Sequence, residues 1–425
     1  MTAASGADEE LPVSVIVASR GRPAALARCL DALTRLFCLT FEIVVVTDAE
    51  GRAAVERTGL AGRLKLVAFD APNLSQARNL GVAAAAGEIL AFIDDDAVPE
   101  PTWLDALAGA FGPPDVAAAG GTVLGRNGIS VQWGPREVNA RGEHRPLATD
   151  GHEIAVFEPP PGRAVRTEGT NMAVRRSVLA ELGGFDPALH FFLEDTDLNL
   201  RLAREGHMTA LVPGAVVHHG FHASARRRAD RVPRSLFEEG ASLAVFLRRH
   251  APEALEERFA VFRAEQRARL LSHMVAGRIE PRDVARLMAS LGEGWEDGMA
   301  RPLQPLPPLS HAARGFLPFE GSVDRGLGVV VAGWAWNARS LRAQAAEAAR
   351  DGATVSLFLF SPTTRRHRVR FTESGVWEQA GGLWGLSERT APRGAALTLR
   401  RRLRREAARV APVRGLQLSP TKRGP

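Results

Sequence analysis

The chain has 425 residues, of which 45% are hydrophobic and 24% charged, so it lies in the globular range with enough apolar residues for two or three cores. This composition excludes a disordered or fibrous protein. The formal charge of +6 is a sum of unlike parts: residues 1–225 hold 19 basic and 28 acidic side chains, or −9, and residues 226–425 hold 35 and 20, or +15. The two parts need separate explanations.

Cysteine content and the N-terminus bear on the compartment. Cys29 and Cys38 lie in one short segment, without a Cys/His cluster that would hold zinc. Residues 1–10 are acidic and lack the apolar region of a signal peptide, and no apolar run approaches the roughly 20 residues of a bilayer span. We therefore expect a cytoplasmic protein.

Strands and helices alternate over the first hundred residues. Apolar, β-branched runs predict strands at residues 13–18, 42–46, 64–69 and 89–93. Helical spacing is found between them, at residues 24–36, 52–58 and 75–86. The alternation predicts an α/β fold with a mostly parallel sheet and helices on both faces, in which ligands bind beyond the carboxyl ends of the strands.

The remainder of the chain changes character several times. Residues 125–163 are polar and rich in Gly and Pro, which predicts a long loop. Patterning resumes with residues 166–174, helices at 176–182 and from Glu194, and a strand at 215–217; Arg-rich amphipathic helices are expected at 235–249, 253–276 and 282–291. Residues 328–332, 340–350 and 354–360 predict a strand, a helix and a strand. We divide the chain into a catalytic domain (1–225), a helical region (226–300), a Pro-rich linker (301–310) and a small α/β region with a basic tail (311–425).

Three adjacent aspartates follow the fourth predicted strand. Asp94, Asp95 and Asp96 come directly after an apolar run, where the ligands of a parallel sheet are expected. Adjacent carboxylates repel one another unless a cation neutralises them, and oxygen-rich sites of this kind suit Mg²⁺ or Mn²⁺ together with phosphate oxygens. A solvated acidic turn is the alternative.

Glu194 and Asp195 lie at a predicted helix start, after the apolar residues 191–193. A carboxylate at that place can cap the helix by accepting from the free amides of the first turn. It can also act as a general base near a phosphoryl group, whose charge would raise its pKa. The pattern leaves both roles open.

Two histidines and an arginine lie beside the same predicted sheet edge. His218 and His219 follow a strand, and because neighbouring strand residues point to opposite faces, only one of them is expected to face a site. It would be either a metal ligand or a structural histidine. Arg78, at the start of a predicted helix, could pair with a phosphate or be solvated.

These motifs, in this order, resemble those of the inverting glycosyltransferases of family 2, which have the GT-A fold. The resembling segments are VSVIVASRGR (13–22), NLSQARN (73–79), GEILAFIDDD (87–96), EGTNMAVR (168–175), GGFD (183–186) and EDTDLNLR (194–201). The resemblance runs over residues 12–220, about half of the chain.

The resemblance implies a role for each matched residue. On the donor side, Ser19, Asp48 and Arg78 would line the nucleotide pocket, Asp94 and Asp95 would lie near the ribose and diphosphate, and Gly169 and Asn171 would border the sugar. Asp96 would bind the divalent cation, Mg²⁺ or Mn²⁺, with His218 as a further ligand. Asp195 would be the general base, with Glu194 on the acceptor side. Trp133, in the predicted loop, would either stack on an acceptor sugar or anchor the loop.

The implied reaction is a single in-line displacement. The cation would stabilise the leaving diphosphate while Asp195 takes the proton of the acceptor hydroxyl, so that the anomeric configuration inverts. Two departures from the family pattern concern base recognition: Arg20-Gly21 stands where an aromatic and Asn are frequent, and Thr47 stands where many members have the first of two aspartates.

The expected partners follow from the same resemblance. They are a nucleotide-diphosphate sugar donor and a glycan or lipid-linked acceptor, in bacterial cell-envelope glycan synthesis. A nucleotidyltransferase-like enzyme that binds sugar nucleotides is the alternative, although the first strand lacks a Gly-rich phosphate loop. Nucleic acid is not expected, because Trp334, Trp336, Trp377 and Trp384 lie away from the densest Arg runs.

The basic half suggests a further partner. Arg-rich amphipathic helices are attracted to anionic lipid headgroups, which would place the protein peripherally on the inner face of the plasma membrane. The alternative is that these arginines are merely solvated and that residues 400–405 form a loose tail.

Overall fold

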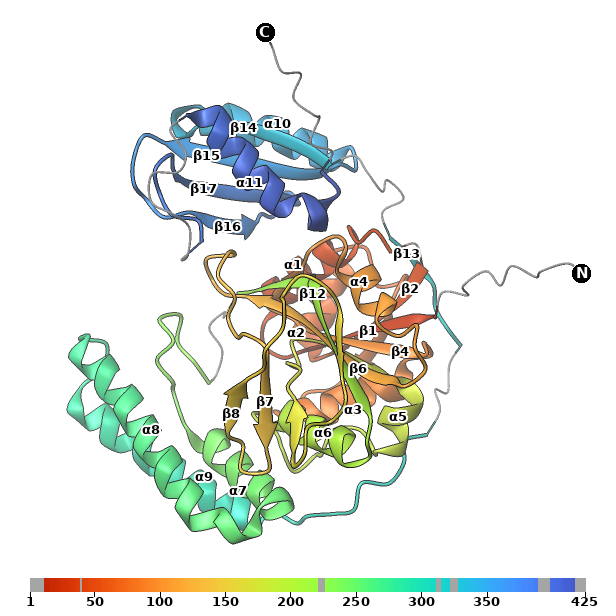
Figure 1. Ribbon diagram of the computed structural model, residues 1–425, viewed down its shortest axis with the longest axis vertical. Helices are drawn as coiled ribbons and strands as arrows, with labels where there is room; N and C mark the ends of the chain where they lie inside the picture. The colour runs from red at the N-terminus through yellow and green to blue at the C-terminus, as the bar shows by residue number, and fades with distance from the viewer. Residues whose placement is uncertain are drawn as a thin grey trace, which may run out of the picture.

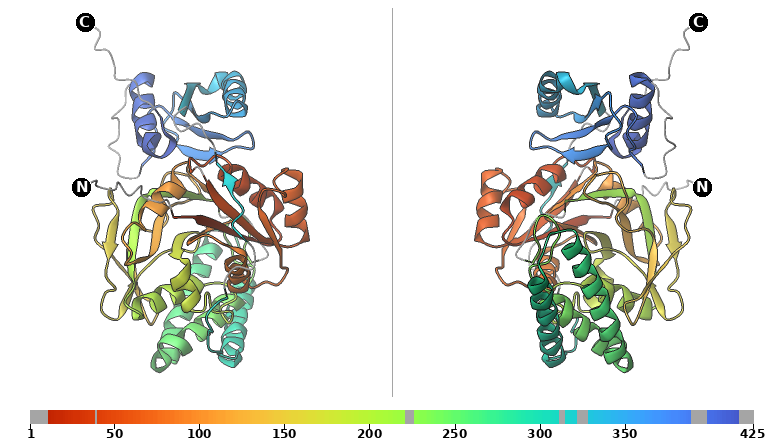
Figure 2. Two further views of the ribbon diagram at one scale, coloured as in Figure 1. Left: turned by 90° about the vertical axis from the view of Figure 1, so that its right-hand side faces the viewer. Right: turned by 90° about the vertical axis from the view of Figure 1, so that its left-hand side faces the viewer.

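The computed structural model describes residues 11–38, 40–220, 226–310, 315–321, 328–388 and 398–416. The acidic start (1–10) and the last part of the basic tail (417–425) lie outside these residues. A large α/β body occupies the centre, with a small α/β unit at one end and a helical hairpin at the other (Figure 1). The same two additions lie at opposite ends in the side views (Figure 2).

In the described part of the chain, ten strands form the central sheet, in the order β13-β2-β1-β4-β11-β6-β12-β5, with β3 beside β2 and β9 beside β12. The strands are β1 (Val13–Ser19), β2 (Thr40–Thr47), β3 (Lys65–Ala68), β4 (Ile89–Asp94), β5 (Ala97–Pro99), β6 (Val116–Leu124), β9 (Ala155–Phe157), β11 (Asn171–Arg175), β12 (Met208–His219) and β13 (Phe319–Glu320). Strands β1 to β4 are parallel, as predicted, whereas β11 runs antiparallel between β4 and β6. The carboxyl ends of β1, β2 and β4 therefore meet at one edge.

Helices cover both faces of this sheet. One face carries α1 (Pro23–Leu33), α2 (Ala49–Arg57) and α4 (Trp103–Gly109), whose apolar residues share a core with alternate residues of β1, β2 and β4. The other carries α3 (Leu74–Ala84), α5 (Arg176–Glu181) and α6 (Glu194–Arg204). Unbroken apolar strands arise because both faces are buried. The predicted fold class, a mostly parallel GT-A type sheet followed by a helical region and a small α/β unit, is confirmed.

The prediction of an irregular loop over residues 125–163 is wrong. This segment holds β7 (Arg136–Asn139) and β8 (His144–Pro146), which pair with β10 (Arg163–Val165) in a separate three-stranded sheet, and it also supplies β9. These strands have only three or four residues, many of them polar, so they show too little alternation to be seen in a sequence.

Three helices follow the body: α7 (Phe237–His250), α8 (Leu255–Val275) and α9 (Pro281–Ala300). Helix α9 continues well beyond its predicted end at residue 291, across glycines that weaken the helical pattern. Those glycines permit close packing on α7. A Cβ on Gly294 would come within 1.9 Å of the Phe237 carbonyl oxygen, and one on Gly298 within 2.2 Å of that of Ala241.

The C-terminal unit has a four-stranded sheet in the order β14-β15-β17-β16. Its elements are β14 (Gly328–Trp334), α10 (Ala338–Arg350), β15 (Thr354–Ser361), β16 (Arg368–Phe371), β17 (Val376–Gly382) and α11 (Leu399–Arg414). The Arg-rich residues 400–405 belong to α11 rather than to a loose tail. Its inner face buries Ala407 and Val410 against Phe358 and Phe360 of β15.

Strand β13 connects the predicted C-terminal region to the body. It pairs with β2 at the edge of the large sheet, so the division of the chain after residues 225, 300 and 310 stays a prediction.

Among the helices that the structure describes, none combines the length and hydropathy that a membrane crossing requires.

Asp197 joins the helical region to the body. It accepts from Arg201 of its own helix, α6, at 2.9 Å and from Nε2 of His250 at the end of α7 at 2.8 Å. Burial alone would raise the pKa of Asp197, but Arg201 and His250 outweigh it and lower the pKa to about 2.

We predict that Asp197→Asn lowers the free energy of unfolding by about 3 kcal/mol at neutral pH, because it leaves a buried ion-pair cluster incomplete. A carboxylate with a depressed folded-state pKa contributes stability above its unfolded pKa, near 4, and loses it as the pH falls toward 2. Urea unfolding of the variant and of wild type should therefore converge with acidification. Asp70→Asn, which removes an exposed carboxylate, is the control; a loss that is the same at every pH would contradict the assignment.

Candidate active site

The three aspartates lie at the carboxyl end of β4, held by residues that follow β1. The Ser19 hydroxyl donates to Asp95 Oδ2 at 2.7 Å, and the Arg22 guanidinium pairs with Asp95 at 2.5 Å and with Asp96 at 3.3 Å. Burial raises the pKa of Asp95 to about 7 even beside Arg22. Asp95 and Asp96 are both buried, whereas Asp94 is partly exposed.

Asp94, Asp96 and His219 form a cluster suited to a divalent cation. One ligand atom from each lies within 4.8 Å of the others, and His219 Nε2 is 3.3 Å from Asp96 Oδ1. Two carboxylates and an imidazole are donors that Mg²⁺ or Mn²⁺ accepts, so the residues fit the expected cation.

The structure brings His219, not His218, to these acids. His218 Nε2 donates to Glu100 at 2.7 Å, and its ring lies 4.6 Å from that of Trp377. Alternation along β12 places the two imidazoles on opposite faces, as expected, but the predicted ligand is the wrong member of the pair. His219 takes its place among the candidate ligands.

Asp48 connects the loops that follow β1 and β2. One carboxylate oxygen accepts from the amide of Gly51 at 2.8 Å as the N-cap of α2, and the other accepts from the amide of Gly21 at 2.6 Å. Gly21 has a φ of +65°, a left-handed conformation that favours glycine. Asp48 therefore shapes the loop that would contact a nucleotide.

Arg78 links the two acidic groups that the sequence singles out. Its guanidinium pairs with Asp94 at 3.3 Å and with Glu194 at 2.9 Å, and it donates to the Gly169 carbonyl at 3.1 Å. A Cβ on Gly169 would lie 2.6 Å from this guanidinium, so the glycine makes room for it. Arg78 thus lies between the triplet at β4 and the start of α6.

Asp195 lies at the start of α6, fully enclosed by donors. Oδ2 accepts from the Gly169 amide at 3.0 Å, and Oδ1 pairs with Arg166 at 2.8 Å. Burial alone would raise the pKa of Asp195, but Arg166 and the Gly169 amide outweigh it and hold the pKa below its usual value. Asp195 is therefore an ionised carboxylate at neutral pH. Burial and the charge of Asp195 raise the pKa of its neighbour, Glu194.

The backbone before Asp195 is strained. Phe192 and Leu193 have φ angles of +77° and +66°, a conformation that non-glycine residues adopt only at a cost of about 1–3 kcal/mol each. Such strain concentrates at functional sites, where the surrounding structure maintains it. Here it allows α6 to begin with Glu194 and Asp195 facing Arg78 and Arg166.

Asn171, predicted to border the sugar, faces the core instead. Its side chain accepts from Trp103 Nε1 at 2.7 Å and donates to the carbonyls of Thr122 and Ala215 at 3.0 and 2.9 Å. These bonds tie β11 to α4, β6 and β12 and leave the amide no exposed surface. Its position favours a structural role.

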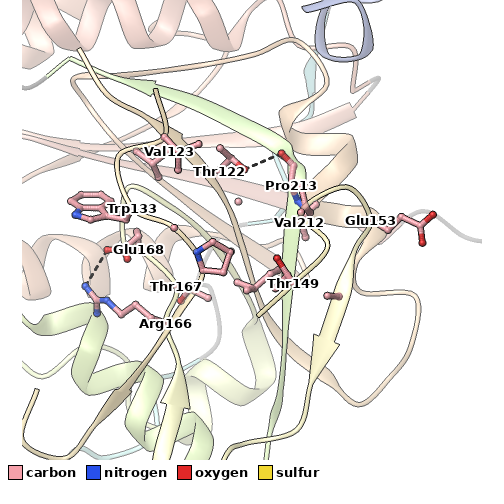
Figure 3. Close-up of a pocket in the computed structure, with 18 residues that line it drawn as sticks. Thr122, Val123, Trp133, Thr149, Glu153, Arg166, Thr167, Glu168, Val212 and Pro213 are labelled. Carbon is pink, nitrogen blue, oxygen red and sulfur yellow. Dashed lines mark hydrogen bonds and ion pairs between the residues drawn. The ribbon is translucent and has the colours of Figure 1, made fainter. Parts of the chain in front are cut away.

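A cavity of about 190 Å³ lies beside Arg166 and Glu168, lined also by β6, β12 and the segment from Val131 to Ala155 (Figure 3). Trp133, Thr149 and Thr167 lie around it, and Arg166 reaches across to Glu168 at 3.1 Å (Figure 3). The Trp133 ring lies 6.4 Å from the His219 ring and 5.4 Å from the Arg136 guanidinium. An aromatic face beside hydroxyls and a carboxylate can hold a sugar ring.

Several site residues escaped sequence reasoning. Gln132 contacts His219 Nδ1 at 3.2 Å and so orients the candidate ligand, and Arg166 holds Asp195. Arg22 lies inside a recognised motif, but only its contact with Asp95 and Asp96 reveals its role. Gln132 stands in the segment predicted as a loop and carries no signal of its own.

The chain is similar in sequence to proteins of known name. A pre-mycofactocin glycosyltransferase of Mycobacterium tuberculosis is 27% identical over 241 residues, and an O-antigen biosynthesis protein of Myxococcus xanthus is 30% identical over 238 residues. They match 56% and 52% of this chain, which covers 48% and 18% of their own lengths.

Among solved structures, a mannosyltransferase of Pyrobaculum calidifontis in complex with GDP-Man and Mn²⁺ is similar, with a TM-score of 0.41 and 17% identity over 69% of this chain and 88% of its own. The model of the family described as "Glycosyltransferase like family 2" matches residues 11–237, more than half of the chain. The chain therefore belongs to the family 2 glycosyltransferases.

Proposed function

We propose that this chain transfers a sugar from a nucleotide-diphosphate donor to a hydroxyl group of a glycan or lipid-linked acceptor, with inversion at the anomeric carbon. The observation that carries the proposal is the pairing of Arg78 with Asp94 on one side and Glu194 on the other. This pairing brings the candidate cation cluster and the helix start that carries the candidate base, Asp195, to the same guanidinium, which supports a displacement between two substrates.

The donor would lie over the carboxyl ends of β1, β2 and β4. Ser19, Asp48 and Arg22 shape the loops there, and Arg78 offers a cation to the diphosphate. Asp94, Asp96 and His219 would hold a Mg²⁺ or Mn²⁺ ion, which when bound neutralises charge on the leaving diphosphate. The donor sugar would then approach Gly169.

The acceptor would enter from the side of Asp195 and the Trp133 cavity. Asp195 is ionised and held in one orientation by Arg166 and the Gly169 amide, so it is a fixed acceptor for the proton of an attacking hydroxyl. Trp133 and the hydroxyls around the cavity would position the acceptor ring. The O-antigen relative supports a surface glycan as the acceptor class.

We predict that the wild-type chain turns over one member of a panel of sugar nucleotides in the presence of Mn²⁺ and that a chelator abolishes this turnover.

Asp195→Asn should lower transfer at least a thousandfold, because asparagine keeps the shape of the side chain but cannot accept the proton. Mn²⁺-dependent nucleotide binding, measured by calorimetry, should change less than about threefold, since no donor contact is removed.

The matched control is Asp197→Asn, two residues further along the same helix, where the carboxylate contacts Arg201 and His250 only within the scaffold. It should keep far more transfer than Asp195→Asn at a temperature where both are folded. Loss of nucleotide binding in Asp195→Asn would show that Asp195 is structural, and turnover that a chelator leaves intact would refute the role of the cation.

We further propose a peripheral contact with an anionic membrane through α11. Arg400, Arg401 and Arg404 are exposed on this helix, whereas Arg402 and Arg414 are buried. The helical hairpin formed by α8 and α9 lies at the other end of the molecule, so α11 alone would carry the contact (Figure 1).

In vesicle sedimentation, the chain should bind phosphatidylglycerol vesicles at low salt and detach as salt is raised, because the attraction is screened. Replacing Arg400, Arg401 and Arg404 by alanine should weaken binding more than tenfold, since each surface arginine contributes about 1 kcal/mol. Phosphatidylcholine vesicles serve as the neutral control. Absence of binding to the anionic vesicles even at low salt would remove this proposal.

A further inference from the structure

We propose that the C-terminal unit is part of the cation site, and that Arg414 of α11 is a positioning residue for the strands that carry Asp96 and His219. This inference rests on the proposed function, because it assumes that these residues hold a cation. It concerns a part of the chain beyond the family match, which ends at residue 237.

Arg414 crosses from the C-terminal unit into the body. Its guanidinium forms two parallel bonds to Glu100, Nε to Oε2 at 2.8 Å and Nη2 to Oε1 at 2.7 Å, and both side chains are buried. Two parallel bonds fix the relative orientation of the two planar groups. Ser356 accepts the remaining bond at 3.2 Å, and the Trp377 ring lies 4.5 Å from the guanidinium.

Glu100 passes this constraint to the cation site. It directly follows β5, and the same oxygen that pairs with Arg414 accepts from His218 of β12 at 2.7 Å. Asp96 directly precedes β5, and His219 follows His218, so Glu100 and His218 join the two strands that carry the candidate ligands. The amide of Gly220 donates to the Asp96 carbonyl at 2.8 Å and closes the other end of this frame.

The C-terminal unit also forms a wall beside the acids. A cavity of about 130 Å³ is lined by Asp95, Asp96 and His219 from the body and by Val369 and Phe371 from β16. The amide of Val369 donates to the Asn127 carbonyl at 2.8 Å, and Val369, Phe371 and Trp377 pack on Ala32, Val98 and Ile129 of the body. The wall is therefore held by apolar contacts as well as by the Arg414–Glu100 pair.

A second buried arginine, Arg402, allows a positioning role of Arg414 to be separated from a general contribution to stability. Arg402, on the same helix, is also buried and paired, but its partner is Glu406 within the C-terminal unit, at 3.0 Å. Removing either arginine costs stability, because each loss takes away one of the positive charges that neutralise a buried carboxylate. Only the loss of Arg414 removes a contact of Glu100, the residue that joins β5 to β12 and so fixes Asp96 relative to His219.

The experiment measures Mn²⁺ binding to the full chain by calorimetry, with Mn²⁺ alone and with UDP, GDP or dTDP. Arg414→Ala should weaken Mn²⁺ binding about tenfold, the lower end of what the loss of a residue supporting metal ligands produces. Arg414→Lys, which keeps the charge but not the two parallel bonds, should fall between this variant and wild type. Arg402→Ala should bind Mn²⁺ within about twofold of wild type, although its melting temperature falls.

Three outcomes would overturn the inference. Arg414→Ala that binds Mn²⁺ like wild type, with a melting temperature lowered as in Arg402→Ala, would make the contact purely structural. If Arg414→Ala does not fold, Arg414→Lys takes its place: wild-type Mn²⁺ binding with a lowered melting temperature in that variant would likewise make the contact purely structural. Failure of the wild-type chain to bind Mn²⁺ under any of the four conditions would refute the cation site of the proposed function, and with it this inference.

Discussion

The structure depends on the neutralisation of buried carboxylates by arginines at one edge of the central sheet. Asp95, Glu194 and Asp195 are almost completely buried, and each is paired: with Arg22, Arg78 and Arg166, respectively. Isolated ionised carboxylates could not be buried there, because the cost of removing a charge from water greatly exceeds the stability of a domain. The arginines allow the sheet to bring together acids that lie far apart in the sequence.

This pairing also gives each acid a different chemical character. Asp195 is held ionised by Arg166 and an amide, which suits a proton acceptor, whereas Glu194 beside it has a raised pKa. Asp94 and Asp96 face His219, where a cation can replace arginine as the neutralising charge. Neighbouring carboxylates thus take different roles because their partners differ and not because their positions in the sequence do.

The opposite charges of the two halves now have a structural meaning. Several basic residues of the second half pair with acids of the first: Arg249 with Asp186, His250 with Asp197, and Arg414 with Glu100. Arg249 and Arg414 therefore use part of the positive charge of residues 226–425 to balance acids of residues 1–225. The three pairs hold the helical region and the C-terminal unit against the body. The arginines that remain exposed, such as those on the outer face of α11, are the ones left for an external partner.

The alternation of strands and helices, the position of Asp94–Asp96 at the end of β4 and that of Asp195 at a helix start could all be predicted from the residues alone. These features depend on local periodicity and on which residues follow a strand. Only the tertiary structure decided between His218 and His219: the pleat separates them, but which one faces the acids depends on Glu100 and Trp377, one of them more than 150 residues away. The inward turn of Asn171 and the pairing of β9 with β12 were also decided by distant partners. Long-range contacts of this kind leave no periodic trace in a sequence, since each depends on a pairing that forms only when the chain folds.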